Sequence, residues 1–84
     1  MIYNLIFDKV AIEQLNKLPK NIRSRIFKKL QDSKNNPFHF FERLTNKKTY
    51  KLRVGNYRII ADIQKRKIAI LVLYVGHRKN IYSS

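Results

Sequence analysis

The sequence predicts an α+β fold, in which a twisted, mainly antiparallel four-stranded sheet carries an N-terminal helical hairpin on one face. Three observations predict it. Apolar residues recur at helical spacing between residues 10 and 34, they alternate with other residues on both sides of Gly55-Asn56, and residues 68–75 are apolar throughout. The chain has only 84 residues, so these elements share one core and form a single domain over residues 1–84.

The N-terminal half predicts one strand followed by two helices. Residues 2–7 are rich in apolar and aromatic strand formers, and Asp8 then serves as the N-cap of a first helix. Pro19 cannot continue that helix, and it suits the first turn of the next one. The second helix runs to about Lys34, where an Asn-Asn-Pro sequence ends it, and the aromatic residues 38–41 form a connecting loop.

The C-terminal half predicts three consecutive antiparallel strands. Gly55-Asn56 is a two-residue hairpin signal, because both residue types tolerate the positive φ that primed turns require. Residues 65–67 form a second turn. Residues 68–75 then make a central strand that is covered on both faces. The predicted order is strand, helix, helix, strand, strand, strand.

The first hairpin gathers positive charge on one face. A two-residue turn places Arg53 opposite Arg58, with Lys51 on the same face as Arg53. The apolar partners Leu52 and Ile59 then point together toward the helices. Like charges that face each other across strands are destabilising, so this arrangement favours a surface that binds an anion over one that only keeps the chain soluble.

The total charge indicates the same class of partner. The formal net charge is +14, from 19 basic and 5 acidic residues. Residues 1–42 carry eight basic and four acidic side chains, whereas residues 43–84 carry eleven basic and one acidic. Such an excess, concentrated in the half that holds the hairpin, is typical of proteins that bind a polyanion such as nucleic acid.

Several other functions lack the residues that they need. There is no cysteine, which excludes disulfides and thiolate chemistry. The five acidic residues are scattered and only two glycines are present, so we expect no metal, no other cofactor and no glycine-rich phosphate loop. No apolar run reaches the roughly 18–20 residues that a membrane-spanning helix requires, and no signal peptide is recognisable. We therefore expect a cytoplasmic protein without a membrane partner.

The residues that are present suit the cleavage of RNA without a metal. In that reaction the ribose 2′-hydroxyl attacks the neighbouring phosphate, which requires a proton acceptor, positive charge on the phosphorane and an acid for the 5′-oxygen. Lys and Arg stabilise the charge, and a Tyr or Lys among cations is favoured in its deprotonated form. His39 and His77 come from different regions, and we interpret each as a lone histidine, with His77 the better candidate for proton transfer.

Two segments resemble the RelE/ParE toxin superfamily of type II toxin–antitoxin pairs, and the resemblance extends over nearly the whole chain. They are residues 50–59, Tyr-Lys-Leu-Arg-Val-Gly-Asn-Tyr-Arg-Ile, and residues 76–82, Gly-His-Arg-Lys-Asn-Ile-Tyr. The helix junction at residues 15–19, Leu-Asn-Lys-Leu-Pro, also fits. The resemblance implies the RelE-like fold, no cofactor, and a toxin. In the RelE branch that toxin is a ribosome-dependent endoribonuclease, which cuts mRNA in the ribosomal A site.

The RelE branch also implies catalytic roles for four residues. Lys51 resembles the lysine that contacts the transition-state phosphate and takes part in proton transfer. Arg58 resembles the phosphate-binding arginine of the third strand. Arg78 resembles the arginine that assists at the leaving oxygen, and Tyr82 resembles the C-terminal tyrosine that stacks on or deprotonates the ribose.

Further basic residues are expected to bind the nucleic acid around this centre. They are Lys47, Lys48, Arg53, His77 and Lys79. Thr49 stands where some RelE enzymes have a second lysine. Fewer residues separate Arg78 from Tyr82 in the sequence than separate the corresponding pair in some members of the superfamily.

The resemblance implies a partner in either branch of the superfamily. That partner is a cognate, RelB-like antitoxin of acidic character, which forms a toxin–antitoxin hetero-oligomer and folds as it binds the basic face. In the ParE branch the same scaffold inhibits DNA gyrase and cuts no RNA. A nucleic-acid-binding module without toxicity is a third interpretation of the basic surface.

Overall fold

The computed structural model describes residues 1–45 and 48–77, and it contains a five-stranded sheet. The strands are β1 (Asn4–Phe7), β2 (Glu42–Arg43), β3 (Tyr50–Val54), β4 (Tyr57–Gln64) and β5 (Ala69–His77). Their order across the sheet is β1-β5-β4-β3-β2, with β1 parallel to β5 and every other pair antiparallel. The predicted α+β class and mainly antiparallel sheet are confirmed, with one strand more than expected.

The strand that the sequence did not predict is β2. Strand β2 has only two residues, Glu42 and Arg43, which pair with Lys51 and Tyr50 of β3. Two residues cannot show the alternation of apolar and polar side chains by which a strand is recognised in a sequence. The preceding segment was also expected to be a loop, and this is wrong for Pro37–Phe40, which forms the short helix α3 with Pro37 in its first turn.

Helices α1 (Lys9–Asn16) and α2 (Lys20–Ser33) begin and end close to the predicted positions. The Asp8 carboxylate caps α1 as expected, because its Oδ2 accepts a hydrogen bond of 3.2 Å from the Val10 backbone N–H. Pro19 stands just before α2 as its N-cap, one position earlier than the first turn. No helix in the described part of the chain is long and apolar enough to span a membrane.

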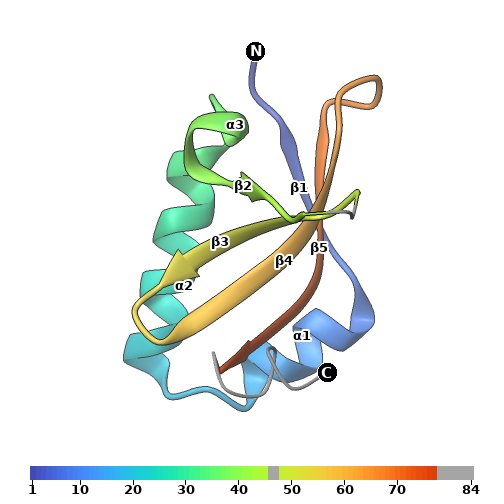
Figure 1. Cartoon of the computed structure of the whole chain (residues 1–84). Coiled ribbons are helices and arrows are strands. Elements are labelled where there is room, and N and C mark those ends of the chain that lie inside the picture. Colours follow the sequence, from blue (N-terminus) through green and yellow to red (C-terminus); the bar gives the residue numbers. More distant parts are fainter. Residues whose placement is uncertain (46–47, 78–84) are drawn as a thin grey trace.

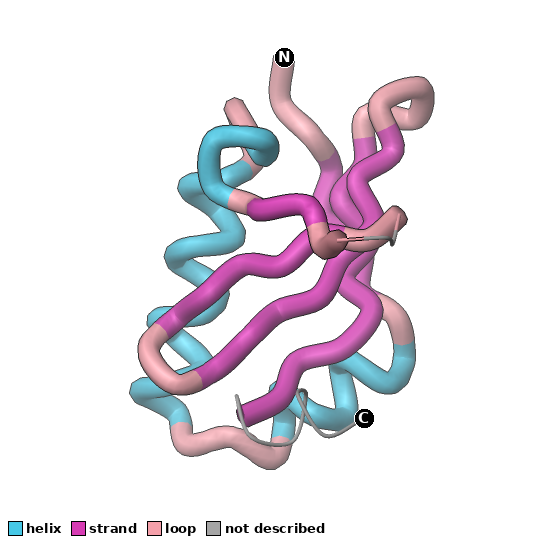
Figure 2. Tube along the Cα trace, in the orientation of Figure 1, coloured by secondary structure: helices cyan, strands magenta, loops and turns pink. Residues whose placement is uncertain are grey.

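Both long helices cover the same face of the sheet, as Figure 1 shows. Their buried residues include Leu15 of α1 and Leu30 of α2, which belong to one core cluster with Leu52, Ile59 and Val72 of the strands. Figure 2 shows that strands β3, β4 and β5 lie side by side, and within residues 1–45 and 48–77 no helix covers their other face. The helices therefore define a covered face and leave an open face.

The hairpin between β3 and β4 has the predicted register. Arg53 pairs with Arg58, and Leu52 pairs with Ile59. Gly55 has a φ of 57°, whereas Asn56 is absent from the residues with positive φ. A positive φ at the first central residue alone is the requirement of a type II′ turn, which matches the twist of the two strands.

A β-bulge interrupts the pairing between β4 and β5. Ile60 pairs with Tyr74 and Ala61 pairs with Val72, so that Leu73 is one residue in excess. After the bulge Val75 faces the core and Gly76 stands opposite Arg58. The Val75 N–H donates a hydrogen bond of 2.6 Å to the Gln14 side-chain oxygen of α1, which ties the bulged end of β5 to the first helix.

Candidate functional site

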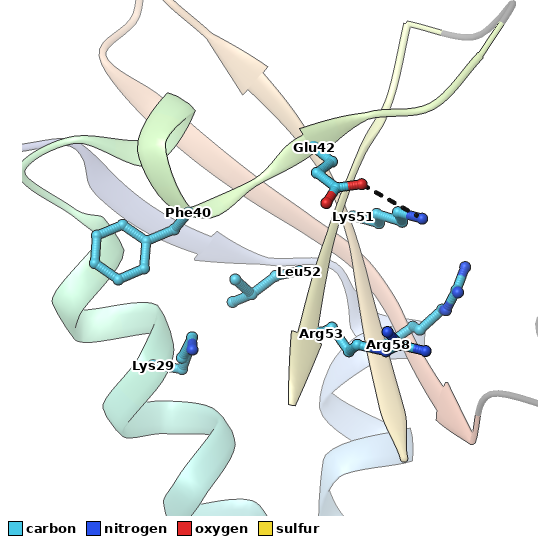
Figure 3. Close-up of a pocket in the computed structure, with 7 residues that line it drawn as sticks. All are labelled: Lys29, Phe40, Glu42, Lys51, Leu52, Arg53 and Arg58. Carbon is cyan, nitrogen blue, oxygen red and sulfur yellow. Dashed lines mark ion pairs between the residues drawn. The ribbon is translucent and has the colours of Figure 1, made fainter. Parts of the chain in front are cut away.

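A pocket of about 140 Å³ opens at the β3 edge of the sheet, beside the short strand β2. Its lining consists of Lys29, Phe40, Glu42, Lys51, Leu52, Arg53 and Arg58. In Figure 3, Lys29, Phe40 and Leu52 lie on the helix side of β3. The side of the open face holds the charged residues Glu42, Lys51, Arg53 and Arg58. The pocket therefore spans the edge of the sheet, and Glu42 is the one acidic residue in its lining.

Strand geometry brings three of the predicted cations to this pocket. Lys51 and Arg53 are two residues apart on β3, so they share its open face, and Arg58 of β4 is the cross-strand partner of Arg53. The predicted clustering of these three side chains is confirmed. Two arginines that face each other do not stabilise a sheet, whereas an anion held between them would be attracted by both.

Arg58 differs from its neighbour in burial. Arg58 is only 6% exposed, whereas Arg53 is an exposed residue. The position opposite Arg58 on β5 is Gly76, which has no side chain to compete for the space above the strand. A guanidinium stays protonated and has a planar set of donors, so its burial fixes these donors in one orientation before any ligand binds.

Lys51 has an acidic neighbour that the sequence did not indicate. The Glu42 Oε2 lies 3.6 Å from the Lys51 Nζ, because β2 pairs these two residues. The Lys51 side chain is 27% exposed and the Glu42 side chain is 77% exposed. An ion pair with one partner so exposed is weak.

The other predicted site residues lie elsewhere or outside the described residues. His77 is the partner of Tyr57 on β4, with ring centroids 5.4 Å apart, so it alternates with Gly76 and does not share the face of Arg58. Lys48 is exposed just before β3. The remaining four predictions fall on residues outside the described ranges, namely Lys47, Arg78, Lys79 and Tyr82.

Sequence reasoning missed three residues that line the pocket. Lys29 is on the exposed side of α2, and its distance from the hairpin in the chain gives no signal that the two meet. Phe40 belongs to the aromatic segment that stood out in the sequence without an assigned role. Glu42 was identified only as one of several scattered acids, and only its pairing within β2 brings it to the site.

Comparisons with known proteins support the fold described above. The family model described as the ParE toxin of the type II toxin–antitoxin system, parDE, matches residues 5–82. No curated protein matches the sequence. Solved structures of RelE toxins match it closely in fold.

Three of these structures show the extent of the similarity. The toxin–antitoxin complex RelBE2 from Mycobacterium tuberculosis matches at 26% identity and a TM-score of 0.85, covering 93% of this chain and 100% of that one. A free-state mutant of the E. coli toxin RelE matches at 27% identity and 0.81, covering 99% and 93%. A RelB–RelE complex from Methanococcus jannaschii matches at 28% and 0.75, covering 93% and 95%.

The family match extends over most of the chain, and the fold matches agree with it in both topology and length. These findings confirm the resemblance stated from residues 50–59 and 76–82. The chain therefore belongs to the ParE toxin family of the RelE/ParE superfamily, and it is a toxin of a type II toxin–antitoxin system.

Proposed function

We propose that this toxin is a ribosome-dependent endoribonuclease, which cuts mRNA in the A site. The observation that carries the proposal is the convergence of Lys51, Arg53 and Arg58 on one pocket from two paired strands. Three cations around a space of this size suit a phosphate group with its extra transition-state charge. A toxin that only occupies a protein surface does not require a buried arginine such as Arg58.

The proposed reaction uses the RNA as its own nucleophile. The 2′-oxygen forms a bond to the adjacent phosphorus, and the bond from phosphorus to the 5′-oxygen breaks. The products are a 2′,3′-cyclic phosphate and a 5′-hydroxyl. Arg58 holds the phosphate, Lys51 stabilises the developing charge and exchanges a proton, and Arg53 binds the flanking backbone. Arg78 and Tyr82 are proposed for the leaving oxygen and the ribose.

The ribosome supplies what this small chain lacks. Among the described residues, the lining of the pocket has two lysines, Lys29 and Lys51, and one carboxylate, so it supplies few groups for proton transfer. Alignment of the 2′-hydroxyl with the leaving oxygen contributes a large part of the rate in such reactions. We therefore infer that the message is cut efficiently only when the ribosome holds it in the required bend.

A cognate antitoxin is the proposed partner that controls this activity. Several of the matching solved structures are complexes of a RelE toxin with a RelB antitoxin. A net charge of +14 favours an acidic partner, which covers the basic open face and keeps RNA away from it. We propose a cytoplasmic hetero-oligomer of the two chains.

Inhibition of DNA gyrase without RNA cleavage is the second candidate function. The matching family model carries the name of the ParE toxins, which favours this alternative. In that case the basic open face would bind the gyrase surface or its DNA. Lys51 would then serve as a binding cation, and its contact with Glu42 would have no effect on chemistry.

One experiment separates the two functions. The full chain is added to a translation extract, and the ends of an mRNA are mapped with and without active translation. In parallel, supercoiling by purified gyrase is measured. Cuts that depend on translation, with normal supercoiling, support the nuclease. Intact mRNA together with inhibited gyrase would assign the ParE activity instead.

A matched pair of variants makes the result specific to the site. Arg58→Ala removes a pocket cation, whereas Arg66→Ala removes an exposed cation from the turn between β4 and β5. The nuclease proposal expects cleavage to depend on Arg58 and not on Arg66. Equal activity of both variants would remove Arg58 from the proposed centre.

A further inference from the structure

A second hollow lies beside the pocket, between α2 and the end of β3. We call it the α2 groove, and its volume is about 270 Å³. Its lining consists of Arg25, Lys28, Lys29, Asp32, Arg53, Val54 and Gly55. Lys29 and Arg53 also line the pocket, so the two hollows adjoin each other. Together they run from the open face, over the β3 edge, to the surface of α2.

The α2 groove is strongly basic. Four of its lining residues are cations and one is an acid, so they carry a net charge of about +3. The acid, Asp32, lies 4.0 Å from the Lys28 Nζ, with the two side chains 51% and 81% exposed. Such an exposed pair contributes little to stability, and it leaves Arg25, Lys29 and Arg53 available to an anion.

The cations are carried by elements that are anchored in the core. Helix α2 is anchored in the core through Ile26 and Leu30, both 0% exposed. A Cβ at Gly55 would lie 3.4 Å from the Arg25 Nη2, so the guanidinium rests against the hairpin turn. The positive charges of helix and hairpin are therefore set side by side before a ligand arrives.

The chemistry of the groove favours a phosphate backbone over an acidic peptide. Peptides bind such surfaces through apolar side chains inserted into pockets as well as through charge. Val54 is the one apolar side chain in the lining, and it is 8% exposed. The lining of the groove thus has cations and no accessible apolar side chain, which is the pattern expected for contacts to phosphates.

We propose that the RNA strand bound in the pocket continues over the β3 edge and along α2, with its flanking phosphates on Arg53, Lys29 and Arg25. This inference rests on the proposed function, because it takes RNA as the ligand. The strand is single, since the path bends around one sheet edge and only a flexible chain follows that bend. A nucleic-acid duplex stays straight over much longer distances.

The salt dependence of binding tests this path directly. The RNA probes carry 2′-O-methyl groups, so that they bind without being cut, and they have lengths of about four and about ten nucleotides. Affinity for the full chain is measured between about 50 and 200 mM salt. The slope is the fall in the logarithm of the binding constant per unit of the logarithm of salt concentration, and each phosphate contact on a single strand contributes about 0.7 to it. We expect the slope of the long probe to be larger than that of the short probe by about 2, from three additional contacts.

The variant that tests the groove combines Arg25→Gln and Lys28→Gln, two cations that line the groove and not the pocket. We expect its slope with the long probe to fall by at least about 0.7, for the lost contact at Arg25, while the short probe binds as it does to the unchanged toxin. Thermal unfolding of each protein verifies that the fold is retained. Unchanged slopes in this variant would overturn the proposed path.

The matched control also removes one arginine and one lysine, at the opposite end of β4. It combines Arg66→Gln and Lys67→Gln, both exposed residues of the second turn. The path predicts that this control keeps the steep slope of the long probe. An equal loss in both variants would mean that only total charge matters, and it would overturn the inference.

Two further outcomes separate this inference from the proposed function. Correct slopes without any mRNA cleavage would count against the nuclease alone and leave the path in place. If instead the α2 variant lost affinity for an acidic peptide and kept the RNA slope, the groove would be a peptide site and the RNA path would be wrong.

Discussion

The two faces of strands β3 and β4 differ in kind, although alternate residues of the same short stretch of sequence build both. On the covered face Leu52 and Ile59 are 1% and 0% exposed and pack with the helices. On the open face the alternate residues Lys51, Arg53 and Arg58 line a pocket. Stability is thus concentrated on one side of β3 and β4, and binding on the other.

The contrast between the two faces shows how a chain of 84 residues combines a stable core with a binding surface. Side chains of a strand alternate between faces, so the register of one hairpin fixes the core and the pocket at once. A change on the covered face is expected to alter stability with little change in ligand preference. A change on the open face is expected to do the reverse.

The largest effect is expected from the covered face. Leu52→Ala removes a fully buried side chain and should lower the free energy of unfolding by about 2–5 kcal/mol, through lost burial and the cavity that remains. Urea-induced unfolding measures this value. Arg53→Ala, one residue along and on the open face, is the control, with a change within about 0.5 kcal/mol. Similar losses in both variants would erase the distinction between the faces.

The next effect is expected from the open face. Arg58→Gln should lower the rate of translation-dependent mRNA cleavage by about 10²-fold or more, as does the loss of other transition-state donors. Arg58→Lys retains the charge without the planar donors and should recover only part of the rate. The rate is measured in the extract beside a melting curve. Full recovery by lysine would show that charge alone is needed there.

A smaller effect is expected where the side chain of Gln14 on α1 is hydrogen-bonded to the backbone of β5. Gln14→Ala leaves the Val75 N–H at the bulge without its partner and should cost about 1–3 kcal/mol of stability. Gln14→Glu keeps an acceptor oxygen and should recover most of this value. Hydrogen exchange of the Val75 amide locates the change. Equal exchange in all three proteins would show that the bulge does not depend on this bond.

The smallest effect is expected at the rim of the pocket. Glu42→Gln removes the charge beside Lys51 and should raise RNA affinity only a few-fold, because exposed ion pairs are worth about 0–1 kcal/mol. The gain should shrink as salt is added. Glu13→Gln, exposed on α1, is the matched control for total charge. The same gain from Glu13→Gln would assign the effect to total charge.

Local signals predicted much of the fold and part of the site. The Gly55-Asn56 turn predicted the register that pairs Arg53 with Arg58. Asp8 predicted the start of α1, and the turn at residues 65–67 forms where expected. Each of these depends on a few adjacent residues and on backbone preferences that neighbours do not override.

Features that arise from contacts distant in sequence were not predicted. Arg58 is buried and stands opposite Gly76 on β5, and Lys29 reaches the pocket because of how α2 crosses the sheet. Strand β2 is defined by its partner, since two residues have no periodicity of their own. Helix α3 was hidden because an aromatic cluster after a proline is compatible with loop and helix alike.

The extra residue at Leu73 decides which side of the sheet the end of β5 presents. If the strand kept its length and paired regularly, Tyr74 would turn inward and Val75 outward, because every side chain after the bulge would change sides. Arg58 would then stand opposite the branched aliphatic group of Val75 in place of the bare backbone of Gly76. Deleting Leu73 would leave each later residue on its present side, so the extra residue and the irregular pairing around it must be kept or lost together.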